Sequence, residues 1–417
     1  MKKKLVGGLN IYHQILFYII LLFSKFLYSS QIYDYQTEKF IENIYLDIIS
    51  VNSFKKKIDI KIINDDFPNA FVTEDNVIHL SSGLFIYSPD YVSVLAVLAH
   101  EIGHIANFHI TKRKMKINNL KKIGGYGNLA SVVGSMIIGQ PELINTIVFN
   151  QTAINNRYLN FSQEQEIEAD FYAVDTLNNL NLPTNSIKEF LLLLENKTEF
   201  DTIDEELKKF STHPLFKTRY EIIDLNENLK NYNYDLKLEN EFNFIKAKFM
   251  AYTNKGFIKK LKKDQRIYYD SIKKSKSGSL IESLKILNLL IPRYDNNIFL
   301  LETKADILLS YGYNKEATEF YKKILINQPD NKYAKYNIFV NIDFKKDENL
   351  NEKFFFENQV LLNSFPYNKT LITKLYSLSK ILELNDWISF FEAILFNKNN
   401  LDQKLIEIKE NTKDYNL

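Results

Sequence analysis

Cysteine is absent from the 417-residue sequence, and this absence excludes several kinds of chemistry. Without a thiol there is no cysteine nucleophile, no sulfur-ligated zinc site and no disulfide framework. The absence of cysteine does not identify the cellular compartment, because many exported proteins do without disulfides. An excess of charge of one sign is also lacking: 53 basic and 51 acidic residues give a formal net charge of +2, too small to argue for a nucleic-acid partner. Hydrophobic residues make up 45% of the chain, which predicts a globular protein with a substantial core.

Long apolar runs are few, and the first lies within residues 1–30. A basic start is followed by nine apolar residues at 15–23, and Lys25 ends the run well short of the about 20 residues that span a membrane. This pattern predicts a signal peptide over 1–30, with the working domains outside the cytoplasm. The alternative is an uncleaved helix that anchors the protein. A second apolar stretch, 123–150, is interrupted by glycines, and it is either a core helix or an element that acts as a lid or faces the membrane.

A His-Glu-x-x-His pattern occupies residues 100–104. On a helix this spacing puts His100 and His104 one turn apart on the same face, where two imidazoles can bind one metal ion. Glu101, beside the first histidine, is then placed to act on a water molecule as a general base. We expect the helix that carries the motif to begin with Ser88 as its cap and Pro89 at its first position.

A zinc site needs a third ligand, and the candidate lies on a second predicted helix around residues 162–177. Glu166 and Asp170 lie one turn apart there, so they can face the two histidines as a pair. Glu166 completes a His₂Glu set and leaves a fourth position open. Asp170 can accept the remaining N–H of a ligand histidine and fix its orientation. His79, on a predicted strand, and His109, off the ligand face, are more consistent with structural roles.

The rest of the chain divides into two predicted parts. Before the motif, residues 58–65 and 76–85 read as strands, and we expect residues 76–82 to form the sheet edge beside the metal. Residues 231–240 are the expected linker. Beyond them, prolines at 292, 329 and 366 recur every 37 residues. The segment 298–329 matches the tetratricopeptide repeat, with small and apolar residues facing each other on two helices. These positions are Leu301, Ala305, Leu308, Ala317, Tyr321 and Ile324.

Several ordered motifs together resemble one family. The zinc-helix motif, the later segment 162–170 and the Thr-His-Pro segment at 212–214 are similar to the BepA-like zinc peptidases, relatives of the HtpX and CAAX prenyl protease families. The Asn-Ala-Phe segment at 69–71 fits the same pattern, so the resemblance spans roughly residues 60–225. It implies an α+β zinc-peptidase domain of the gluzincin-like kind, with the motif helix beside a small sheet, followed by an all-α tetratricopeptide-repeat array.

The expected domains are a signal peptide at 1–30, a metallopeptidase domain at 31–230, a linker at 231–240 and a repeat domain at 241–417. The resemblance implies one zinc ion per chain, bound by His100, His104 and Glu166, with Glu101 as catalytic base. Asp170 is expected to support the ligands. His213, in the Thr-His-Pro motif, is either a group that contacts the reacting oxyanion or restrains the site, or a structural histidine. Arg219 is expected to hold the loop or the site in place.

The resemblance also implies a function and a place in the cell. It points to a periplasmic zinc endopeptidase that degrades misfolded or stalled outer-membrane proteins, with possible chaperone activity. Its expected partners are unfolded or misassembled proteins and, through the repeats, the outer-membrane assembly machinery, with peripheral membrane contact. The alternative is a latent peptidase that acts mainly as a repeat-based binding module. Glu101 favours the enzyme, because a pure binding protein does not need this residue.

Overall fold

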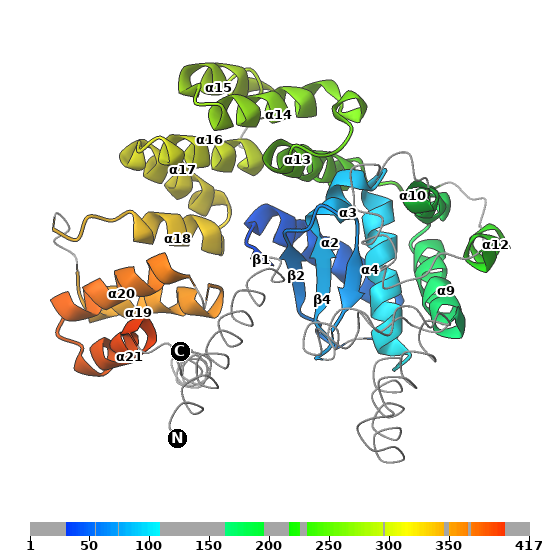
Figure 1. Ribbon diagram of the computed structural model, residues 1–417, viewed down its shortest axis with the longest axis horizontal. Helices are drawn as coiled ribbons and strands as arrows, with labels where there is room; N and C mark the ends of the chain where they lie inside the picture. Colours follow the sequence, from blue (N-terminus) through cyan, green and yellow to red (C-terminus); the bar gives the residue numbers. More distant parts are fainter. Residues whose placement is uncertain are drawn as a thin grey trace, which may run out of the picture. The chain divides into compact units, whose positions relative to one another are not determined.

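The computed structural model describes residues 31–54, 56–73, 75–108, 163–195, 217–225, 232–294, 297–345, 350–365 and 368–396. The chain forms two compact units (Figure 1). The first comprises Met1–Tyr33 and Thr37–Leu261, and the second comprises Asp34–Gln36 and Lys262–Leu417. The expected signal peptide, the apolar stretch 123–150 and the residues His109, His213 and Pro366 lie outside the described residues.

A four-stranded sheet lies in the first unit, in the order β1-β2-β4-β3. Its strands are β1 (Gln31–Ile32), β2 (Ile60–Ile63), β3 (Ala70–Val72) and β4 (Ile78–Ser81). β2 and β4 are parallel, while β1 and β3 each pair antiparallel at the outside. Leu80 lies opposite Ile62 on one side and Ala70 on the other, and all three are buried. The expectation that 76–82 forms the edge is therefore wrong: β4 is paired on both sides, and β3 is the outermost described strand beside it.

The strand expected over 76–85 ends early, because its second half is the helix α3 (Ser82–Tyr87). The Ser81 side chain accepts a hydrogen bond from the Leu84 amide and so caps this helix. Gly83 allows α3 to lie directly on the preceding loop, since a Cβ there would stand 2.4 Å from the carbonyl carbon of Phe67. The short-range apolar pattern does not reveal this turn from strand to helix.

The motif helix is α4 (Tyr91–Ala106), which lies between the sheet and α9 (Gln163–Asn179) in Figure 1. It begins at Tyr91 with Asp90 as its cap, whose carboxylate accepts the Ser93 amide at 2.8 Å. The expected start at Ser88 and Pro89 is therefore wrong, and Ser88 instead ends α3. Gly103 lets α4 and α9 approach closely, because a Cβ there would lie 3.0 Å from the Tyr172 Cβ.

The structure describes further helices in the first unit. They are α2 (Tyr35–Val51), α10 (Asn185–Glu195), α12 (Lys217–Leu225), α13 (Leu236–Thr253) and the 3₁₀ helix η3 (Ile258–Lys260). α2 belongs to this unit except for Tyr35 and Gln36. α13 packs against both α3 and α4, with the Phe249 ring 5.5 Å from that of Phe85. The expected linker 231–240 thus contains the start of a packed helix, and the units divide after Leu261. The cause is the apolar face of α13, whose Phe242 and Met250 are fully buried.

The second unit is helical throughout its described residues. Its α-helices are α14 (Lys263–Lys276), α15 (Leu280–Leu287), α16 (Ile298–Ser310), α17 (Asn314–Asn327), α18 (Lys332–Val340), α19 (Glu352–Gln359), α20 (Lys369–Ile381) and α21 (Asn385–Phe396), with short 3₁₀ helices η4 (Ile291–Arg293) and η5 (Val360–Asn363). The facing residues predicted for α16 and α17 do pack together: Ala305, Leu308, Ala317, Tyr321 and Ile324 form one cluster, against which Leu301 lies. Within the described part of the chain, every helix is too short or too polar to cross a bilayer.

Candidate metal centre

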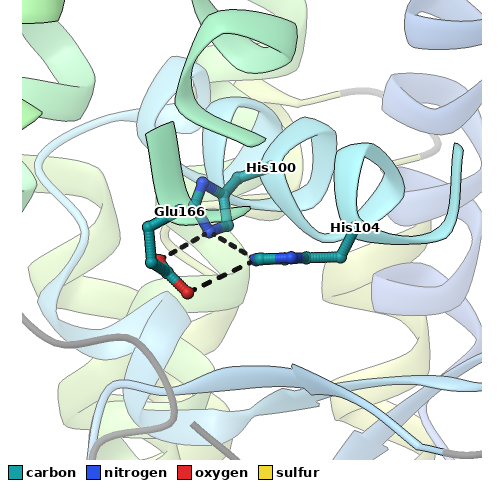
Figure 2. A group of neighbouring side chains, drawn as sticks. All are labelled: His100, His104 and Glu166. Atoms are coloured by element: carbon teal, nitrogen blue, oxygen red, sulfur yellow. Dashed lines mark hydrogen bonds and ion pairs between the residues drawn. The ribbon is translucent and has the colours of Figure 1, made fainter. Parts of the chain in front are cut away.

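Two neighbouring helices bring three potential metal ligands to one point. α4 supplies His100 and His104, and α9 supplies Glu166 from the opposite side (Figure 2). The ligand atoms of these residues all lie within 4.8 Å of one another. Nε2 of His100 is 3.1 Å from Nε2 of His104 and 3.4 Å from a Glu166 carboxylate oxygen. The second Glu166 oxygen lies 3.7 Å from Nε2 of His104.

These separations fit a zinc ion. Ligand atoms at 2.0–2.1 Å from a tetrahedral metal stand about 3.3 Å apart, close to the observed spacings. Nδ1 of His100 lies 2.9 Å from Asp170, so it carries the proton and leaves Nε2 with its lone pair. That lone pair then faces a carboxylate and a second imidazole among buried side chains, since all three residues are at most 4% exposed. Electron-rich atoms that converge in a buried place need a cation between them.

The electrostatics of His100 agree with this need. Burial by itself lowers the pKa of His100, but the hydrogen bonds to Asp170 and Glu166 outweigh burial and raise the pKa above its ordinary value. The surrounding carboxylates therefore attract positive charge to the imidazole. A divalent metal supplies that charge and competes with the proton for the same nitrogen. The site is built to stabilise a cation at Nε2 of His100.

Asp170 and Arg219 form the support behind the ligands. Arg219, on α12, donates from Nε and Nη2 to the two oxygens of Asp170, each at 2.7 Å. Its Nη1 lies 3.6 Å from Glu166. Burial raises the pKa of Asp170, but Arg219 and His100 outweigh it and hold the pKa below its ordinary value. Asp170 thus stays a carboxylate and orients His100, while Arg219 balances the negative charge of both acids.

Glu101 is 1% exposed and lines a cleft next to His100. The walls of this cleft come from α4, from α10, from Arg219 and from the residues around the start of β3. The structure therefore brings together His100, Glu101, His104, Glu166, Asp170 and Arg219, while His213 lies outside the described residues. The sequence analysis missed the part that α10 plays, although the apolar run at residues 190–194 was a signal for a buried helix face.

Comparison with known proteins supports the same chemistry. Residues 36–226 match Peptidase family M48. The beta-barrel assembly-enhancing protease of Escherichia coli is 25% identical over 185 residues, which are 43% of this chain and 37% of that protein. Its counterpart in Yersinia pestis is 26% identical over 171 residues, covering 40% and 34%. The metalloprotease LoiP of Escherichia coli is 34% identical over 112 residues, covering 26% and 40%.

The matches concern one part of each protein. The chain spans only 34–40% of the length of these relatives, and the family match at residues 36–226 lies in the first unit except for Gln36. Within that unit, the family match covers α4, α9 and α12, which carry the His–His–Glu group and its Asp–Arg support. Residues 36–226 therefore form a zinc metallopeptidase domain of the M48 type, similar to the beta-barrel assembly-enhancing proteases.

Proposed function

We propose that this protein hydrolyses peptide bonds in unfolded protein chains, with one zinc ion bound by His100, His104 and Glu166 and with Glu101 as the general base. The observation that carries the proposal is the meeting of the three ligand atoms within 4.8 Å next to a cleft that Glu101 lines. A purely structural metal site has four protein ligands and no adjacent cleft. The three-ligand group beside an open cleft is typical of a catalytic site.

Zinc, when bound, polarises the scissile carbonyl and lowers the pKa of a water molecule toward about 7. The carboxylate of Glu101 takes a proton from the attacking water and passes it to the leaving nitrogen. Asp170 keeps the Nδ1–H tautomer of His100 in place, so Nε2 stays available as a ligand. Arg219 keeps Asp170 ionised, because its guanidinium donates two hydrogen bonds to that carboxylate, and it also lies 3.6 Å from Glu166. His213 is the proposed donor to the oxyanion that develops on the substrate.

The proposed substrates are misfolded or stalled outer-membrane proteins. An unfolded chain can enter a cleft beside an edge strand in extended form and pair with that strand. β3 is the strand available for this, since the cleft is lined by Ala70. The names of the relatives from Escherichia coli and Yersinia pestis connect them with beta-barrel assembly and proteolysis. We extend this role to quality control in the periplasm, reached through the signal peptide proposed for residues 1–30.

The helical second unit is proposed to be a tetratricopeptide-repeat array that binds partners of the outer-membrane assembly machinery. The packing of α16 against α17 through Ala305, Ala317 and Tyr321 supports a helix-hairpin repeat. The recurrence of proline every 37 residues supports several copies. Chaperone activity would follow if this unit also holds unfolded chains that the first unit does not cleave.

The test compares the wild-type protein with Glu101→Gln, which removes the base but keeps the shape of the side chain. Purified, zinc-loaded protein is incubated with casein, and zinc content is measured in parallel. We expect one zinc per chain in both proteins and a loss of cleavage of about 10²–10⁴-fold in the variant. Cleavage by Glu101→Gln at the wild-type rate would rule out Glu101 as the base.

The alternative function, a latent peptidase that acts as a binding module, predicts a different result. Zinc-loaded wild-type protein would then leave casein intact and would still suppress the aggregation of an unfolded outer-membrane protein. Glu101→Gln would suppress aggregation equally well, because holding a chain needs no base. Cleavage by the wild type decides in favour of the enzyme.

A further inference from the structure

The cleft beside Glu101 is lined mainly by apolar side chains. Four of them come from successive turns of α10, one from α4, one from the segment before β3 and one from the first residue of β3. They are Ile187, Phe190, Leu191 and Leu194, then Val97, and then Pro68 and Ala70. Ile187, Phe190 and Leu191 are at most 5% exposed, so the rest of the unit fixes the position of this wall. Val97 lies one helical turn before Glu101 and faces the same cleft.

The charged groups of the described cleft wall are already engaged. Arg219 gives two hydrogen bonds to Asp170 and lies against Glu166. His100 is committed through Nδ1 to Asp170 and through Nε2 to the metal group. Glu101 is needed for proton transfer. A substrate side chain that enters this cleft therefore meets apolar surface, and an ionised side chain would lose its hydration there without gaining a partner.

The role of Glu101 as the base identifies which substrate residue places its side chain in the cleft. The carboxylate of Glu101 passes its proton to the nitrogen of the broken peptide bond, so it must lie beside that nitrogen. The nitrogen belongs to the residue that follows the scissile bond. Its side chain starts one bond further on, at the Cα, and the cleft that Glu101 lines is within its reach.

We propose that this cleft is the specificity subsite for the residue that follows the scissile bond, and that it selects leucine, isoleucine, methionine or phenylalanine. The inference rests on the proposed peptidase function, because it uses Glu101 as the proton carrier. It adds a substrate class to that function: segments with large apolar residues, which a folded protein buries and a misfolded one exposes. Leu194, half-buried at the cleft wall, is the specificity-determining position most open to substitution.

The test reads cleavage sites in a mixture of unfolded proteins, by mass spectrometry of the new amino termini. In the wild type we expect the four apolar residues to be enriched at least about tenfold over aspartate and glycine at the position after the bond. Leu194→Lys should weaken that enrichment and admit aspartate and glutamate. Leu194→Ala, a milder change, should shift the preference toward phenylalanine. Leu192→Lys is the matched control, because Leu192 lies on the same helix, is 46% exposed and is outside the cleft wall.

Three results would overturn the subsite. They are an apolar preference at the residue before the bond, no preference at either position, and equal effects of Leu194→Lys and Leu192→Lys. If the wild type cleaves nothing, the peptidase proposal fails, and binding decides the subsite separately. Calorimetry with the peptides Leu-Ala-Ala and Glu-Ala-Ala, which mimic the leaving side, should then show tighter binding of Leu-Ala-Ala by wild-type protein but not by Leu194→Lys. Equal binding of both peptides by the wild type would rule the subsite out.

Discussion

The two ends of α4 both bury charged groups, yet they do so in different ways. At the first end, Asp90 accepts hydrogen bonds from Ser93 and from Ser186 of α10. Glu239 of α13 accepts the Tyr91 amide at 3.2 Å, and the Lys246 ammonium donates to the Ser88 carbonyl at 2.8 Å. Burial lowers the pKa of Lys246 to about 8, with Glu239 and Asp90 acting against that decrease. These charged groups pair with hydrogen-bond donors and acceptors of the protein itself.

At the other end, buried ligand atoms from two helices converge on one point. His100, His104 and Glu166 direct three electron-rich atoms toward one point, and Asp170 and Arg219 lie behind them. A helix end can be fixed by ordinary hydrogen bonds, so convergence of this kind is not needed for stability alone. The difference shows that the first end of α4 holds the helix in place, while the second end is arranged for a cation. The same helix is therefore anchored at one end and reactive at the other.

Truncation of α13 within its second turn should break the anchored end and produce the largest effect. A chain that ends at Asn240 lacks Phe242 and Met250, which are fully buried against the first unit. Burial of each such side chain stabilises the fold by about 1.5–3 kcal/mol, so the loss of this helix face consumes much of the stability of a domain, typically about 5–15 kcal/mol. We expect this chain to be insoluble or unfolded by circular dichroism and unable to hold zinc.

A chain that ends at Leu261 is the matched control, because it keeps α13 and ends where the first unit ends. It should fold, bind zinc and cleave casein. Zinc binding and cleavage by the chain that ends at Asn240 would show that the buried face of α13 is dispensable. That result would contradict the role given to the first end of α4 in holding the helix in place.

Asp170→Asn should weaken the metal end while leaving the anchored end intact. The amide oxygen can still accept from His100, but the negative charge that fixes the tautomer and pairs with Arg219 is gone. Loss of such a supporting group lowers metal affinity by about 10–100-fold. Competition with a zinc-binding dye measures this effect. Glu239→Gln, at the other end of α4, should change thermal stability but not zinc affinity. Equal zinc affinities in wild type and Asp170→Asn would contradict the role given to this residue.

Gly103→Ala should produce a smaller effect, on the contact between α4 and α9. The added methyl would stand 3.0 Å from the Tyr172 Cβ and 3.2 Å from the Ala169 Cα, so the helices must separate slightly. Overpacking of this kind costs about 1–3 kcal/mol, and it also moves Glu166 away from the histidines. We expect a lower midpoint in urea together with weaker zinc binding. Glu168→Ala, on the exposed face of α9, should stay within about 0.5 kcal/mol of the wild type. A Gly103→Ala protein as stable as the wild type would disprove the close packing.

The metal group could be predicted from the sequence because its geometry is local. His100 and His104 share a face by helical spacing, and so do Glu166 and Asp170, whatever the rest of the chain does. Only the contact between the two helices depends on tertiary structure. A zinc site with two imidazole ligands needs a third ligand, so it requires this contact. The pairing of α16 with α17 was predictable for a similar reason, since small residues such as Ala305 and Ala317 recur at fixed offsets.

The remaining features depend on contacts between distant segments, and these the sequence does not display. Ser88 and Asp90 are both good helix caps, and Asp90 is used where Ser186 also bonds to it. The edge position of β3 follows from the pairing of β4 with β2, which no turn motif predicts. The late boundary after Leu261 follows from burial of the α13 face against α3 and α4. The helix cap, the sheet edge and the unit boundary all depend on contacts between segments that are distant in the sequence, so local sequence patterns do not predict them.

The zinc content of wild-type protein and of Glu166→Ala, both reconstituted with zinc and then dialysed, tests the central claim most directly. Elemental analysis should find about one zinc per chain in the wild type and almost none in the variant, because two imidazoles alone do not hold the ion firmly. Circular dichroism of the variant should remain that of a folded protein. One zinc per chain in both proteins, or none in either, would contradict a metal centre built from His100, His104 and Glu166.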